Sequence, residues 1–155
     1  MNLDARFGAV VERLDELALR APTGALSEPD PGGDERWEQA QVWAHIAEFV
    51  PYWHDQVESV IAGYHGTPVP FGRTKADAGR IEGIEIGRRE PISVLHDRAR
   101  HDIGSVRAYL SGLTPREWKA VGLHPRRGEM DVEEIVAEFL ANHLEEHADQ
   151  LDKLG

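Results

Sequence analysis

The chain has 155 residues, a length that suits one domain with a buried core and is too short for two. Hydrophobic residues make up 41% and charged residues 29%, a composition typical of a globular protein, so we predict one domain over residues 1–155. The 28 acidic and 17 basic residues give a formal net charge of -11. This balance argues against a nucleic acid as partner, because backbone phosphates favour clustered Lys and Arg.

Cysteine is absent, which excludes disulfides, thiolate metal sites and a cysteine nucleophile. Any thiol chemistry would therefore use a thiol from outside the chain. The N-terminal residues are already charged and amphipathic, and no apolar run has the length of a signal peptide or a membrane span. The sequence therefore predicts a cytoplasmic protein without a membrane partner.

The first predicted helix covers roughly residues 3 to 20, where apolar side chains recur at helical spacing. Glycines and prolines between Pro22 and Gly33 predict a connecting loop that ends near Asp34. A second helix is predicted from about residue 37 to 62, interrupted only by Pro51, which should bend it. Its apolar face contains Val42, His45, Ile46, Phe49, Trp53, Val57 and Val60.

Six glycines and two prolines between residues 63 and 90 predict a long loop, a candidate lid over a site. A third helix should begin at Pro91 and stop at Gly112. Thr114 to Glu117 has the form of a capping box and predicts a short helical turn. Asp131 followed three residues later by Glu134 predicts the start of a fourth helix that continues to the C-terminus.

Four amphipathic helices without a convincing period-2 segment predict an all-α protein, a four-helix bundle. The two linkers before the second and third helices have about 16 and about 28 residues. Such lengths favour crossover connections over tight hairpins.

His143 and His147 lie four residues apart, so both imidazoles project from one face of the last helix. That face is the apolar one, and an unsatisfied polar group in a core costs about 1 to 3 kcal/mol. His45 lies on the apolar face of the second helix, and a third inward histidine would complete a three-ligand metal site. Spacing alone leaves open both a metal site and histidines that hydrogen-bond their neighbours.

The segment from His143 to His147 also fits the H-x-x-E-H pattern of reversed zinc peptidases. We reject this interpretation, because such enzymes need a third ligand well downstream and only eight residues follow His147. The other histidines lack a partner at ligand spacing on an apolar face and are predicted on the surface; they are His54, His65, His96, His101 and His124. The tryptophans are predicted mainly as core residues.

Three sequence motifs together resemble the DinB-like (damage-inducible) metalloprotein superfamily over nearly the whole chain. The first is a tryptophan, Trp37, eight residues before His45. The second is the segment from Gly122 to Gly128 before the last helix, and the third runs from Asn142 to Leu151. The superfamily includes proteins like YfiT, thiol-dependent maleylpyruvate isomerases, and bacillithiol or mycothiol transferases.

The resemblance implies a DinB-like helical bundle with His45, His143 and His147 as ligands of one divalent metal ion, and it implies a homodimer. Zinc is the expected ion, with nickel or iron as alternatives; no organic cofactor is predicted. Three neutral nitrogens leave coordination positions for water or substrate, which suits catalysis. Some thiol-dependent relatives have Glu where this chain has His143, which weakens direct transfer of their isomerase activity.

The leading hypothesis is an enzyme in which the ion activates water or a low-molecular-weight thiol for transferase, isomerase or hydrolase chemistry on a small molecule. Glu48 and Glu146 are candidates to orient ligands or carry a proton, although exposed charges are the expectation for both. Specific catalytic residues stay unassigned. The alternatives are a non-catalytic metal- or small-ligand-binding protein of the same fold, and a helical interaction module without a metal.

Overall fold

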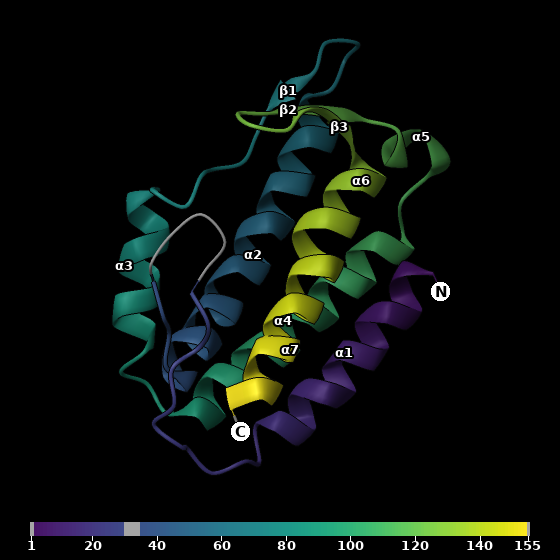
Figure 1. Ribbon diagram of the computed structural model, residues 1–155. Coiled ribbons are helices and arrows are strands. Elements are labelled where there is room, and N and C mark those ends of the chain that lie inside the picture. Colours follow the sequence, from purple (N-terminus) through teal and green to yellow (C-terminus); the bar gives the residue numbers. More distant parts are fainter. Residues whose placement is uncertain (1, 30–34, 155) are drawn as a thin grey trace.

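The computed structural model describes residues 2–29 and 35–154 (Figure 1). Four long helical segments lie side by side and confirm the predicted four-helix bundle. They are α1 (Leu3–Leu17), α2 (Gln39–Gly63), α4 (Ile92–Ser111) and a C-terminal segment made of α6 (Val132–Val136), the π-helical η1 (Ala137–Asn142) and α7 (His143–Leu154). The predicted loop residues Pro31, Gly32, Gly33 and Asp34 lie outside the described residues.

The bundle has the crossover connectivity that its long linkers predict. Helix α1 packs against α4 and the C-terminal segment, and α2 packs against the same two elements. Consecutive helices α1 and α2 therefore stand diagonally across the bundle. The core is almost entirely apolar, and its largest fully buried side chains are Trp43, Phe7, Phe49, Leu14, Ile46 and Leu95. Within the described ranges, no helix is long and apolar enough to cross a membrane.

The prediction of a long loop over residues 63–90 is wrong, because this segment contains strand β1 (Val69–Pro70) and helix α3 (Ala78–Gly87). The Asp77 side chain accepts a hydrogen bond from the Arg80 backbone N–H and so caps α3. A Cβ added at Gly87 would lie 3.0 Å from the Ala44 Cβ, and one at Gly83 would lie 2.8 Å from the Glu48 Cγ. These glycines therefore let α3 pack closely on α2.

A three-stranded sheet, which the sequence did not predict, covers one end of the bundle (Figure 1). Strand β1 pairs in parallel with β2 (Val121–His124), and β2 pairs antiparallel with β3 (Gly128–Asp131). The turn between β2 and β3 ends at Gly128, whose φ is 75°. Such short strands contain too few alternations of polar and apolar residues to be recognised from the sequence between helices.

Both predicted capping boxes are present. The Thr114 hydroxyl caps α5 (Pro115–Trp118) by accepting from the Glu117 N–H, and the Thr114 N–H donates in return to the Glu117 carboxylate. Asp131 and Glu134 form the same pair of bonds at the start of α6. Helix α2 continues through Pro51 without interruption.

The two glycines Gly122 and Gly104 should respond to alanine with opposite signs. A Cβ at Gly122 would lie 2.5 Å from Phe71 and 2.9 Å from Val60, so Gly122→Ala should destabilise the fold by about 1 to 3 kcal/mol. A Cβ at Gly104, exposed in α4, meets nothing within 4 Å, so Gly104→Ala should stabilise by about 0.5 to 1 kcal/mol. Urea unfolding of both variants measures the difference; equal effects would contradict this packing.

Candidate metal centre

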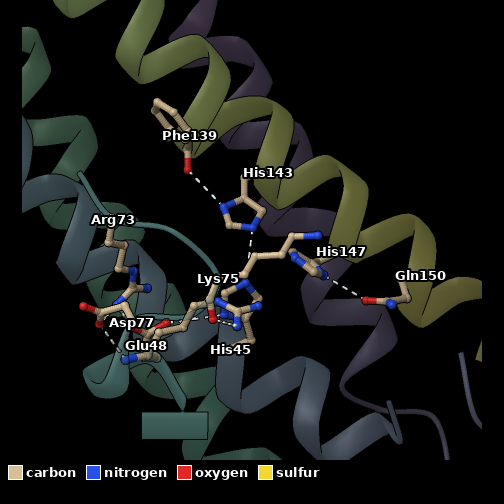
Figure 2. A network of polar contacts seen from close by, with 10 residues as sticks. His45, Glu48, Arg73, Lys75, Asp77, Phe139, His143, His147 and Gln150 are labelled. Carbon is tan, nitrogen blue, oxygen red and sulfur yellow. Dashed lines mark hydrogen bonds and ion pairs between the residues drawn. The ribbon is translucent and has the colours of Figure 1, made fainter. Parts of the chain in front are cut away.

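The three predicted site histidines lie together in the bundle. His45 projects from the N-terminal third of α2, while His143 and His147 stand one turn apart at the start of α7 (Figure 2). Each offers one ring nitrogen, and these nitrogens all lie within 4.8 Å of one another. The Nε2 atoms of His45 and His143 are 3.2 Å apart.

The opposite nitrogen of each ring faces an acceptor. His143 Nδ1 lies 3.3 Å from the Phe139 carbonyl oxygen, and His147 Nδ1 lies 2.8 Å from Gln150 Oε1. His45 Nδ1 lies 3.3 Å from Glu48 Oε2, outside good hydrogen-bond alignment. An acceptor at Nδ1 places the proton there and leaves Nε2 as a lone pair, the tautomer that a metal ligand requires.

This arrangement fits a divalent ion better than a hydrogen bond between the rings. A hydrogen bond from His45 to His143 would need a proton on one Nε2, and the Nδ1 lone pair of that ring would then face another acceptor. With both protons at Nδ1, two lone pairs approach each other and repel unless a cation lies between them. Zinc–nitrogen bonds of about 2.0 to 2.1 Å in tetrahedral geometry separate two ligand nitrogens by roughly 3.3 Å.

Burial keeps the rings of His45 and His143 neutral. His45 is 3% exposed, and burial lowers its pKa well below the ordinary value of 6.5, with further lowering from the charges of His147, His143, Arg80 and Arg73. Burial also lowers the pKa of His143 well below 6.5, although the Phe139 carbonyl acts in the opposite direction. A metal therefore meets little proton competition at either ring.

Aromatic side chains surround the three rings. Phe49 stacks on His143 with the ring centroids 3.9 Å apart. Trp37, the first residue of the sequence motif, stacks on His147 at 6.1 Å and meets His45 edge-on at 5.2 Å. These contacts fix the ring orientations and restrict water around the nitrogens.

Glu48 is partly buried, which corrects the expectation that it is an exposed charge. Its side chain is 14% exposed and forms an ion pair with Arg73, which is itself 8% exposed. The Arg73 guanidinium also lies 3.8 Å from the centroid of the Tyr52 ring. Glu48 therefore links His45 to Arg73, a role that the sequence indicated only through its position one turn after His45.

A cavity of about 250 Å³ opens beside the histidines and is lined by His45 and His143. Its wall also contains the basic residues Arg73, Lys75, Arg80 and Arg127 and the acidic residues Glu138 and Glu146. A second cavity of about 660 Å³ is lined by His147 and again by Glu146. Glu146 is exposed as expected, but it lies where both cavities meet the site.

The prediction that His124 is a surface residue is wrong. It is 6% exposed, and its Nδ1 accepts hydrogen bonds from the backbone N–H groups of Arg126 and Arg127 at 3.1 Å each. Its ring stacks on Phe139 with the centroids 4.9 Å apart. His96 is also held inside, 2.7 Å from Asp15 between α4 and α1. His65 and His101 are exposed as predicted.

Among the tryptophans, Trp43 is fully buried and confirms the core prediction. Trp53 combines both roles, since it is 4% exposed and also lines the cavity beside His45.

Comparison with known families supports the resemblance found in the sequence. The model of the DinB superfamily matches residues 4–151. No curated protein sequence matches the chain.

Solved structures share the fold. A mycothiol-dependent maleylpyruvate isomerase superposes with a TM-score of 0.73 at 15% identity, over 97% of this chain and 61% of that one. This chain thus spans less than two thirds of the isomerase. YfiT from Bacillus subtilis, described as a probable metal-dependent hydrolase with an unusual four-helix bundle topology, gives 0.73 at 18% identity, over 98% and 83%. An uncharacterised protein from Clostridium difficile 630 gives 0.68 at 10% identity, over 97% and 92%.

The metal-free protein should lose stability as the pH falls below about 6.5. Because the folded-state pKa values of His45 and His143 are lowered, the unfolded chain binds more protons in this range. Each histidine contributes a slope of up to about 1.4 kcal/mol per pH unit. Urea unfolding at several pH values between about 7.5 and 5 measures this slope. His143→Leu should flatten it, and His65→Gln should leave it unchanged; an unaltered slope in His143→Leu would contradict this assignment.

Proposed function

Since the chain belongs to the DinB superfamily, we propose that it is a metal-dependent enzyme in which His45, His143 and His147 hold one divalent ion. Zinc is the proposed ion, and nickel or iron would also suit three imidazoles. When bound with an open coordination position, such an ion lowers the pKa of water or a thiol and so supplies a nucleophile at neutral pH. The proposed reaction class is transfer, isomerisation or hydrolysis on a small molecule.

One observation carries this proposal. Three imidazoles from two helices direct one nitrogen each toward a common point, while their other nitrogens face Glu48, Phe139 and Gln150. In a purely structural histidine cluster, the buried lone pairs of His45 and His143 would oppose each other without a compensating partner, which is costly. A cation at that point satisfies all three.

The names of the structural neighbours support the choice of nucleophile. One neighbour is named as a mycothiol-dependent isomerase and another as a probable metal-dependent hydrolase. Thiol and water are thus the two candidates. This chain has no cysteine, so a thiol would come as a separate small molecule.

In this proposal the surrounding residues hold the ligands and the reactants. Glu48 orients His45, Gln150 orients His147, and the Phe139 carbonyl orients His143. Glu146 lies on the walls of both cavities, where its carboxylate could accept a proton from an incoming water or thiol. We also propose that the chain acts as one domain in the cytoplasm and pairs as a homodimer through helix faces.

The metal content of untagged protein, never exposed to a nickel column, tests the ligand set. We expect about one equivalent of divalent metal per chain by elemental analysis, lost in His45→Ala and in His143→Ala. His101→Ala, which changes an exposed histidine, should retain the metal. No metal in the parent protein would refute the enzyme proposal and leave a helical binding module. Metal without activity on any low-molecular-weight thiol or hydrolysable substrate would support the non-catalytic alternative.

Glu48→Gln tests the orienting role. The amide keeps the shape of the side chain but removes the charge that holds Arg73 and faces His45. We expect a loss of about 10- to 100-fold in metal affinity, measured by competition with a chelator. Glu58→Gln, at an exposed position of the same helix, is the matched control and should change affinity little. Equal affinities for Glu48→Gln and the parent would show that Glu48 only stabilises the fold.

A further inference from the structure

Four of the 17 basic residues of this acidic chain line one cavity. Arg73, Lys75, Arg80 and Arg127 line the space of about 250 Å³ beside His45 and His143. They come from the segment before α3, from α3 itself and from the turn between β2 and β3 (Figure 1). Three separate parts of the chain therefore supply positive charge to the same small space.

Ion pairs hold Arg73 and Arg127 in place at the cavity. Arg73 pairs with Glu48 and lies 3.9 Å from Asp77, and Arg127 pairs with Glu138 on the opposite wall. They frame the cavity, and their charge is largely balanced by these carboxylates.

Lys75 and Arg80 line the same cavity as His45 and His143. Arg80 Nη1 donates to the Lys75 carbonyl oxygen at 3.1 Å, and its guanidinium lies 5.6 Å from the centroid of the Trp37 ring, which itself packs on His45 and His147. Figure 2 shows the Lys75 side chain directed toward the three histidines.

The charge balance then depends on the ion. The four cations face four carboxylates, with Glu138 and Glu146 on the cavity wall and Glu48 and Asp77 behind it. Three neutral imidazoles do not offset a divalent ion, so binding the ion leaves the site with an excess positive charge of two. In a partly buried site such an excess is costly and favours an anionic ligand.

The second cavity has the opposite character. Around His147 it is lined by Glu28, Glu146 and Asp149, with Lys153 as its cation. The candidate metal centre therefore lies between a basic cavity and an acidic one. An anion is directed toward the basic side, next to His45 and His143.

We propose that the basic cavity binds the anionic group of a small-molecule substrate, a carboxylate or a phosphate, through Lys75 and Arg80 beside the metal position. The guanidinium offers two parallel N–H donors to such a group, and the ammonium supplies a point charge. This inference rests on the proposed function and names the substrate class for that same site.

Calorimetric titration of the zinc-loaded full chain tests this proposal. The probes are glutarate as the carboxylate, methyl phosphate as the phosphate, and glutaramide as the neutral analogue of glutarate. We expect one of the two anions to bind at least tenfold more tightly than glutaramide, and the stronger anion identifies the group. Lys75→Gln and Arg80→Gln should each weaken that anion about tenfold or more. These two substitutions should not weaken zinc binding, because each removes a positive charge that repels the ion.

Two controls separate a specific subsite from general attraction. Lys153→Gln removes the cation of the acidic cavity, and Arg89→Gln removes an exposed charge at the end of α3. Both should retain full anion binding. The proposal is overturned if glutaramide binds as tightly as both anions, or if Lys153→Gln weakens the anion as much as Arg80→Gln. Zinc binding with no anion preference would overturn this inference and leave the enzyme proposal standing, whereas a chain that binds no zinc would refute the enzyme proposal and, with it, the charge argument for an anion.

Discussion

The approach of two imidazole nitrogens to 3.2 Å inside an apolar bundle is the constraint on which the rest of the site depends. Burial removes water from both rings, and their outer nitrogens face acceptors, so their inner lone pairs oppose each other. Proteins tolerate such an arrangement when a cation compensates it or when the protein is stable enough to bear the cost. Holding three nitrogens in place thus lowers the free energy of unfolding of the metal-free protein.

The supporting structure is distributed over the whole chain. His45 is held through Glu48, Glu48 through Arg73, and Arg73 by the segment that leads into α3. Helix α3 can take this position because Gly83 and Gly87 let it contact α2. On the other side, the π-helical turn η1 directly precedes His143, and its Phe139 supplies the carbonyl that faces the His143 ring. π-helical turns are rare and occur frequently at functional sites.

Charge separates the two faces of the site. The basic cavity and the acidic cavity meet at the histidines, and Glu146 borders both. With a basic cavity on one side of the histidines and an acidic cavity on the other, two small-molecule reactants of the proposed reaction would enter through different cavities. They would then not compete for the same binding residues. Four of the 17 basic residues line the same small cavity in a chain with net charge -11, and this local arrangement supports an anionic ligand there.

The sequence by itself determined the four amphipathic helices, both capping boxes and the placement of His45, His143 and His147 on apolar faces, because these features depend on residues within one or two turns. It did not determine α3, the small sheet or the burial of His124. Glycines at 83 and 87 look like loop signals locally and act as close-packing positions only once α2 is beside them. The tertiary structure alone decided which acceptors face the imidazoles and which cations line the cavity, since these contacts join residues far apart in the chain.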